Sequence, residues 1–279
     1  MRTRSLVFLA TIAIIGGIAI AIWRGTGPLP DPEQCEATVA GRTVPLSTEQ
    51  GRNAALIAAI GVQRGLPARA VSIALATAYQ ESKIRNLAGG DRDSIGLFQQ
   101  RPSQGWGTPA QIRDEHYSIN KFYEALEKIH GYETMRITEA AQEVQRSGYP
   151  EAYEEHAPDA RALASALTGY STGGAFTCVW HTPKGHSTAS VAQSSLDDAF
   201  GTVGAARTGS RQDFTISVDA GIEGNRRGWA YAQYLVAMAG PLKIHEVTYD
   251  GRTWKTGRAS EKGWQRSTAS PTKVSVSLG

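Results

Sequence analysis

The chain has 279 residues, of which 41% are hydrophobic and 20% are charged, a composition typical of folded globular proteins and not of disordered or fibrous ones. This length accommodates one or two domains with connecting segments. A net charge of +3 at pH 7 is too small over such a chain to favour nucleic acid as a partner.

The N-terminal segment is apolar enough to cross a membrane. Residues 6–23 contain Thr11 as their only polar side chain, and a helix of these 18 residues spans about 27 Å, close to the roughly 30 Å hydrocarbon core of a bilayer. Arg2 and Arg4 precede the segment, so the positive-inside rule leaves the N-terminus in the cytoplasm. The sequence predicts that residues 1–24 form a transmembrane helix, that residues 6–23 contact the cytoplasmic membrane, and that the bulk of the chain is extracytoplasmic.

A cleaved signal peptide is the alternative interpretation of the same segment. Ala19-Ile20-Ala21 has the small-x-small form that signal peptidase requires, and cleavage would make the protein secreted. The triplet lies inside the apolar run with no polar stretch before it, which favours an uncleaved signal-anchor. Both interpretations export the remainder of the chain.

The two cysteines fit an exported protein. Cys35 and Cys178 are the only ones, both lie beyond the apolar segment, and an even pair in an oxidising compartment favours a disulfide bond. Such a bond would close a loop of about 140 residues and bracket a domain, and the chain-entropy model gives ~4 to 5 kcal/mol for a loop of that size. The sequence has neither a C-x-x-C redox motif nor a Cys/His zinc cluster, so we expect no metal and no cofactor.

The rest of the chain divides by composition and periodicity. Residues 25–34 are rich in proline and glycine, as in a stalk. Residues 35–178 show mostly helical periodicity, and residues 179–195 are rich in Thr, Pro, Gly and Ser, which is typical of a linker. Residues 196–279 combine alternating strand patterns with one apolar helix. We therefore expect a mainly α domain over 35–178 and a small α/β domain over 196–279.

Two helices at the start of the mainly α domain lead to a carboxylate. Ser47 and Gln50 have the form of a capping box that opens one helix, and Pro67 suits the first turn of the next. That second helix, residues 68–81, is apolar around most of its circumference, so we expect it to be buried. Its last turn delivers Glu81 to the turn-rich stretch that follows.

Glu81 lies where the acid catalyst of a glycosidase would be placed. Cleaving a glycosidic bond requires a proton on the leaving oxygen, and a carboxylic acid supplies it near neutral pH only where a cleft of low dielectric raises its pKa. The loop over residues 87–107 adds glycines for close backbone approach, with Gln99, Gln100 and Trp106 for hydrogen bonding and stacking on sugar. By residue type alone, a solvated surface glutamate is the alternative.

Three short motifs follow one another in this region: Glu81-Ser82, Gly96-Leu97-Phe98-Gln99-Gln100 and Ala140-Ala141-Gln142. Their order resembles the E-S, G-L-M-Q and A-Y-N motifs of soluble lytic transglycosylases and goose-type lysozymes, which belong to the lysozyme-like superfamily. The wider text is similar to lysozyme-like domains of exported bacterial wall proteins and phage lysins. The resemblance covers roughly residues 35–178 and implies a lysozyme-like fold that acts on the glycan strands of peptidoglycan, with Glu81 as the acid/base.

The resemblance also implies roles for neighbouring side chains. Ser82 would steady the glutamate, Gly96 would form part of the cleft wall, and Gln99 would contact the substrate. Gln142 stands where the family usually has Asn, with no Tyr before it, and would bind substrate there. Family members often place a Tyr hydroxyl near the catalytic Glu; Tyr153 is the candidate, with core packing as the alternative.

Asp91 and Asp93 bear on the type of reaction. A carboxylate about 6.5 to 9.5 Å from Glu81 across the sugar could activate water and give hydrolysis with inversion, as in a muramidase. Without one, the substrate's own N-acetyl group or 6-hydroxyl must complete the reaction, giving the 1,6-anhydro product of lytic transglycosylases. Residues 89–94 are also rich in turn formers, so an Asx turn is the alternative for both aspartates. A calcium loop is disfavoured because the Gly and the distal Glu of an EF-hand are lacking in the sequence.

Together these features predict a membrane-anchored, extracytoplasmic enzyme that cleaves peptidoglycan glycan strands. The small C-terminal domain shows no catalytic signature, and from its position we expect it to bind the wall or an envelope protein. The alternative is a non-catalytic peptidoglycan-binding or scaffolding protein of an envelope-spanning apparatus, since a fold can persist without its chemistry.

Overall fold

The computed structural model describes residues 30–149, 151–207 and 213–278. Glu33–Gly279 form one compact unit in which helices and strands are mixed, with 46% of residues helical and 18% in strands. Within the described ranges no helix is long and apolar enough to span a membrane. The predicted span at residues 6–23 lies outside these ranges.

The first part of the unit is mainly helical and carries one small sheet. The expected helix over residues 68–81 is present, and the capping box of Ser47 and Gln50 opens the helix before it, as predicted. In chain order the elements are β1 (Gln34–Val39), β2 (Arg42–Leu46), α2 (Thr48–Gln63), α3 (Ala68–Ser82), α4 (Pro109–Arg113), α5 (Glu115–Leu126), α6 (Ile137–Gln145), α7 (Ala157–Leu167) and β3 (Phe176–Val179), with short 3-10 helices η1 (Pro102–Gln104) and η2 (Glu154–His156).

The second part contains the larger sheet. Its strands are antiparallel and lie in the order β4-β5-β9-β6-β7-β8. The predicted hairpin is present, and its turn residues Asp250 and Gly251 have φ of 44° and 70°, the positive values that a tight hairpin favours. The elements are α8 (Ala189–Phe200), β4 (Ala205–Arg207), β5 (Phe214–Ser217), α9 (Ile222–Ala237), α10 (Ala239–Leu242), β6 (Ile244–Tyr249), β7 (Arg252–Lys255), η3 (Gly257–Lys262), β8 (Gln265–Arg266) and β9 (Lys273–Leu278).

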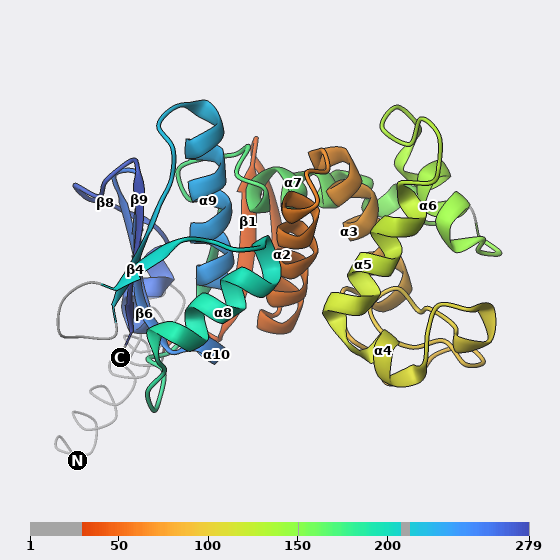
Figure 1. The fold of residues 1–279 in the computed structure, drawn as a ribbon, viewed down its shortest axis with the longest axis horizontal. Helices are drawn as coiled ribbons and strands as arrows, with labels where there is room; N and C mark the ends of the chain where they lie inside the picture. The colour runs from red at the N-terminus through yellow and green to blue at the C-terminus, as the bar shows by residue number, and fades with distance from the viewer. Residues whose placement is uncertain (1–29, 150, 208–212, 279) are drawn as a thin grey trace, which may run out of the picture. The chain divides into compact units, whose positions relative to one another are not determined.

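Helix α2 is central to the unit. It contacts α3, α5, α7, α8 and α9, and in Figure 1 it lies with α8 and α9 to one side and α3 and α5 to the other. Small residues make these approaches close: Ala54 and Ala58 are fully buried, and a Cβ on Gly61 would lie 2.6 Å from the Val71 side chain. Because α2 is packed on so many sides, both parts of the unit depend on its position.

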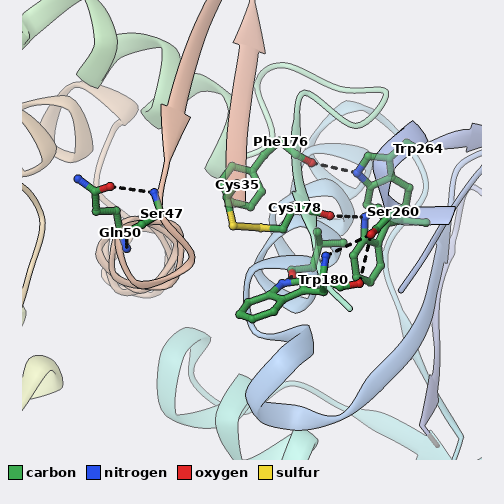
Figure 2. Close-up of a disulfide and its surroundings, with 10 residues drawn as sticks. Cys35, Ser47, Gln50, Phe176, Cys178, Trp180, Ser260 and Trp264 are labelled. Carbon is green, nitrogen blue, oxygen red and sulfur yellow. Dashed lines mark hydrogen bonds between the residues drawn. A yellow bond between two sulfur atoms is a disulfide. The ribbon is translucent and has the colours of Figure 1, made fainter. Parts of the chain in front are cut away.

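The three-stranded sheet, in the order β2-β1-β3, holds the predicted disulfide. β1 and β2 form a hairpin, and β3 pairs with β1 in antiparallel register with Cys35 directly opposite Cys178. The two cysteines are bonded and buried, which confirms the predicted bridge (Figure 2). The bond ties together strands that are 143 residues apart in the sequence.

Side chains from the second part cover the free edge of β3. The indole nitrogen of Trp254 donates to the carbonyl oxygen of Cys178 at 3.1 Å. The indole nitrogen of Trp264 donates to the carbonyl oxygen of Phe176 at 3.0 Å, as Figure 2 shows, and the N–H of Phe176 donates to the buried Gln233 at 2.8 Å. An edge strand otherwise presents unpaired backbone groups, so these bonds fasten the two parts of the unit to each other.

The expected fold class, a mainly α lysozyme-like domain with a small C-terminal α/β domain, is wrong for the described residues, which form a mixed α/β unit. The transmembrane helix of the same expectation falls outside these residues, among which no helix is suited to a bilayer. One cause lies at residues 34–46, where buried and exposed positions alternate over two short strands just before the first long helix. Strands of six and five residues give a weak signal beside helices of 15 and 16 residues.

The second cause is long-range packing, which sequence periodicity does not report. Helix α9 buries its apolar side against α2, α7 and β3 as well as against β6 and β9 of the six-stranded sheet. Helix α8 begins at Ala189, inside the stretch expected to be a linker. The domain boundaries at 178 and 196 stay a prediction, because burial shared across them does not show which part folds alone.

Loss of the disulfide is expected to destabilise the unit. In the double variant Cys35→Ala, Cys178→Ala the unfolded chain regains the freedom of the open loop, so the free energy of unfolding should fall by ~4 to 5 kcal/mol. Urea denaturation followed by circular dichroism measures the change, with the reduced parent protein as the control. Equal midpoints for the oxidised parent and the double variant would contradict a stabilising role for the bond.

Candidate functional site

The last turn of α3 places Glu81 at the surface and Ser82 in the interior. Glu81 is half-buried, whereas Ser82 is 4% exposed. The Ser82 hydroxyl donates to the carbonyl oxygen of Leu97 at 2.7 Å and accepts from the N–H of Arg85 at 3.1 Å. Ser82 therefore fastens the end of α3 to the second motif, which steadies the glutamate beside it.

The turn after α3 has a strained backbone. Lys83 and Ile84 lie in the left-handed region with φ of 55° and 56°, which is unfavourable for a β-branched residue such as Ile84. Two side chains of α2 hold this turn. Gln50 Nε2 donates to the carbonyl oxygen of Lys83 at 2.8 Å. Asn53 Nδ2 donates to that of Ile84 at 2.9 Å, so α2 sets the path of the chain directly after Glu81.

A buried phenol contacts the carboxylate. The Tyr153 hydroxyl donates to Glu81 Oε1 at 2.7 Å, and Tyr153 is fully buried. Burial of the phenol, and next the negative charge of Glu81, raise the pKa of Tyr153 above its ordinary value. The phenol therefore stays protonated and keeps donating to the carboxylate. The Ser147 side chain also hydrogen-bonds to this phenol.

The second motif folds as a tight loop that requires glycine. Gly96 has a φ of 80°, and its N–H donates to the carbonyl oxygen of Leu87 at 2.8 Å. A Cβ at this position would lie 2.9 Å from the carbonyl oxygen of Ile112. Gly96 therefore lets the backbone at Leu87 and the backbone at Ile112 both approach this loop closely.

The two glutamines of this motif have different surroundings. Gln99 is half-buried, with a φ of 47°, and its side chain lies over Gly90, where a Cβ would be only 1.7 Å from Oε1. Gln100 is 2% exposed, and its Nε2 donates to the carbonyl oxygen of Ser118 at 3.1 Å. Gln99 thus remains accessible to a substrate, whereas Gln100 holds the loop to α5.

Helix α6 contributes two glutamines on one face, at i and i+3. Gln142 Nε2 donates to the carbonyl oxygen of Ser147 at 2.8 Å. Gln145 Nε2 donates to the carbonyl oxygen of Phe98 at 2.8 Å. Their Oε1 atoms are buried and have no hydrogen-bond partner among the described residues. Helix α6, which carries the third motif, is thereby joined to the second motif through Gln145. Gln142 of the third motif bonds to Ser147, whose side chain contacts the Tyr153 phenol.

Trp106 lies beside a groove of about 750 Å³ between the 104–106 turn, α5 and the end of α6. Its floor is partly apolar, with Ala125 and Ile129, and Gln145 lines it from α6. Tyr117 donates from its hydroxyl to the Trp106 carbonyl oxygen at 3.2 Å, which holds the turn. Glu81 is not among the residues that line this groove.

The two aspartates, Asp91 and Asp93, have different surroundings. Asp91 is exposed, and its ion pair with Arg92 is long, at 3.8 Å. Asp93 accepts from Arg101 Nε at 2.8 Å and from the backbone N–H and hydroxyl of Ser103 at 2.8 and 3.0 Å. The hydrogen bond from Arg101, followed by those from Ser103, holds the pKa of Asp93 well below its usual range. Asp93 is therefore a weak base that stabilises the turn.

The fold thus assembles much of the predicted site from separate segments. Glu81 and Ser82 of α3 meet Tyr153 from the segment before η2 and the Leu97 backbone of the 96–100 loop. Sequence reasoning missed Ser147, Gln145 and Asn53, which hold these groups in place. Gln145 had a signal, since it repeats Gln142 one helical turn on; the other two had none. The described residues contain no group of three or more His, Cys, Asp or Glu side chains arranged to hold a metal ion.

Two comparisons of the sequence with known proteins found no match. No protein-family model matches the chain, and no curated protein is found with significant similarity to it. Function must therefore be argued from the site residues and their chemistry.

The raised pKa of Tyr153 gives a stability test of its burial as a protonated phenol beside Glu81. Below pH 10 the phenol is protonated in both states; above it the unfolded tyrosine loses its proton while the folded Tyr153 retains it. The stability of the parent should therefore decline as the pH rises above 10, and less steeply in Tyr153→Phe. Urea unfolding at a series of pH values measures the slopes, with the exposed Tyr149→Phe as the matched control. Parallel slopes for Tyr153→Phe and the parent would refute the assignment.

Proposed function

We propose that this protein cleaves the glycan strands of peptidoglycan, with Glu81 as the general acid and then the general base. The observation that carries the proposal is the hydrogen bond from the buried Tyr153 hydroxyl to Glu81 Oε1, at 2.7 Å. It fixes one oxygen of a half-buried carboxyl group in the first of three motifs that resemble those of lytic transglycosylases and goose-type lysozymes, and Ser82 joins this motif to the second. The resemblance supports the choice of substrate.

The two halves of the reaction use the same side chain. In the first, the protonated Glu81 carboxyl gives its proton to the glycosidic oxygen between MurNAc and GlcNAc, and the C1–O bond breaks with its electrons passing to the leaving sugar. In the second, the Glu81 carboxylate takes the proton of the attacking hydroxyl as a new bond forms to C1. Tyr153 keeps the carboxyl group oriented throughout, because its own proton stays on the phenol.

The attacking hydroxyl in this proposal is the 6-hydroxyl of the same MurNAc residue. An inverting hydrolysis needs a second carboxylate that can act as a base on water. Asp93 is bound by Arg101 and Ser103, and its lowered pKa makes it a poor base. These contacts favour intramolecular attack and a 1,6-anhydro product over hydrolysis.

We further propose that the enzyme works outside the cytoplasm, at the membrane or secreted. The buried Cys35–Cys178 bond supports this location, since structural disulfides persist in oxidising compartments. Peptidoglycan lies in the same compartment. The six-stranded sheet is the part that we propose to contact the wall or an envelope protein.

Replacement of the carboxyl group tests the proposal directly. Glu81→Gln keeps the size of the side chain and can still accept from Tyr153, but it has no proton to give, so the rate of muropeptide release from purified wall should fall at least ~100-fold. The exposed Glu36→Gln is the matched control and should retain the parent rate. Equal rates for Glu81→Gln and the parent, or no release by the parent, would instead support the non-catalytic wall-binding protein.

The reaction type can be read from the products. We expect Asp91→Asn to cleave at the parent rate, and Asp93→Asn to lower thermal stability through loss of the Arg101 contact while still yielding anhydro ends. Mass spectrometry separates anhydro ends from reducing ends, which contain one more water. Reducing ends from the parent, together with a rate loss of ~100-fold in either variant, would identify an aspartate as a base and the enzyme as a muramidase.

A further inference from the structure

A cavity of about 640 Å³ lies beside α2, and Asn53, which holds the turn that follows Glu81, is one of its lining residues. Its lining residues come from α2, the start of α5, α8 and the α9–α10 region, so both parts of the unit contribute to it. This volume is within the range of small-molecule sites, and the lining combines apolar with polar groups. The apolar side chains are those of Leu56, Val191, Met238 and Leu242.

The Arg52 side chain lines this cavity and has a hydrogen-bond donor that is not satisfied. Its Nε is buried and has no hydrogen-bond partner, and no ion pair joins its guanidinium to a carboxylate in the described part of the chain. A buried guanidinium nitrogen without a partner is costly, so such a group calls for a ligand or water. Arg52 also borders a smaller cavity lined by Lys184, Lys243 and Glu33, where the positive charges outnumber the negative one and favour an anion near the guanidinium.

Carboxylates lie across the same cavity. Glu49, Glu115 and Asp198 line it, against the single guanidinium of Arg52. Glu115 already accepts from Asn86 at 2.6 Å, but the carboxylates of Glu49 and Asp198 form no ion pair or hydrogen bond with any described residue. A ligand that satisfied these groups would need ammonium groups as well as a carboxylate.

Hydroxyl groups of α8 complete the polar lining. Ser190 and Ser194 face the cavity as neutral hydrogen-bonding groups, and Ser195 bonds to the Tyr234 hydroxyl at 2.9 Å, which fixes that wall. The cavity lining thus contains a cation, several carboxylates and neutral donors and acceptors. This pattern matches an amino acid or short peptide better than a neutral sugar.

We propose that this cavity binds a small zwitterion, an amino acid or short peptide with a carboxylate at Arg52 and free ammonium groups at Glu49 and Asp198. A basic diamino acid fits best, because the lining carries more carboxylates than cations. Free amino acids and the peptides of wall fragments share this chemistry. The inference does not depend on wall cleavage by Glu81, and its test uses binding alone.

Titration calorimetry on the full-length chain tests the site with four probes. L-lysine and L-lysyl-D-alanine carry both kinds of charge and should bind, the tighter of the two identifying the free or the peptide form. L-norleucine lacks the side-chain ammonium and 1,5-diaminopentane lacks the carboxylate, so both should bind about tenfold more weakly or worse. The proposal fails if neither lysine probe binds at about 10 mM, or if norleucine binds as well as lysine.

Two variants locate the binding in this cavity. Arg52→Gln should weaken both lysine probes about tenfold and leave diaminopentane unchanged, because only the carboxylate contact is removed. Ser194→Trp fills the cavity from the surface of α8 and should abolish binding of all probes while Arg52 stays in place. The exposed Arg161→Gln on α7 is the matched control. Unchanged lysine affinity in Arg52→Gln or Ser194→Trp, with melting temperatures like the parent's, would place binding elsewhere and overturn the proposal.

Discussion

The arrangement of the candidate site depends on how the chain leaves α3. Two successive residues, Lys83 and Ile84, adopt a left-handed backbone that side chains disfavour, and their carbonyl oxygens are held by Gln50 and Asn53 of α2. Without those two hydrogen bonds the turn would relax, and Ser82 would no longer meet the carbonyl oxygen of Leu97. The position of Glu81 is therefore set less by its own helix than by the contact between α2 and α3, which is close because both helices present small side chains there.

Local sequence signals foretold the parts of this arrangement that depend on local physics. The capping box at Ser47, the buried helix that ends at Glu81, and the need for glycine at Gly96 each follow from a few neighbouring residues. The pairing of Cys35 with Cys178 could be predicted from the presence of only two cysteines and from the oxidising compartment expected for an exported chain. Tyr153 was found through resemblance, since nothing in its own surroundings along the chain points to a residue 72 positions earlier.

Other features were beyond sequence reasoning because they arise from packing at long range. The bonds from Trp254 and Trp264 to the edge of β3 join residues more than 70 positions apart, and they fasten the second part of the unit to the first. Asp93 was weighed as a base or as a turn residue, and only the positions of Arg101 and Ser103 distinguish the two. In each case the residue type allowed two roles, and its partners, which the sequence does not reveal, decided between them.

Helix α2 connects the two parts of the unit, and its polar residues contact different neighbours on its different faces. Gln50 and Asn53 are three positions apart and face the turn after α3, while Glu49, Arg52 and Leu56 lie on the neighbouring face toward α8. Asn53 belongs to both sets, because it lines the cavity and also donates to the carbonyl oxygen of Ile84. The buried Asn53 amide thus connects the charged cavity to the backbone that positions Glu81. Because its N–H donors must be satisfied, the geometry of the cavity is coupled to that of the turn after α3.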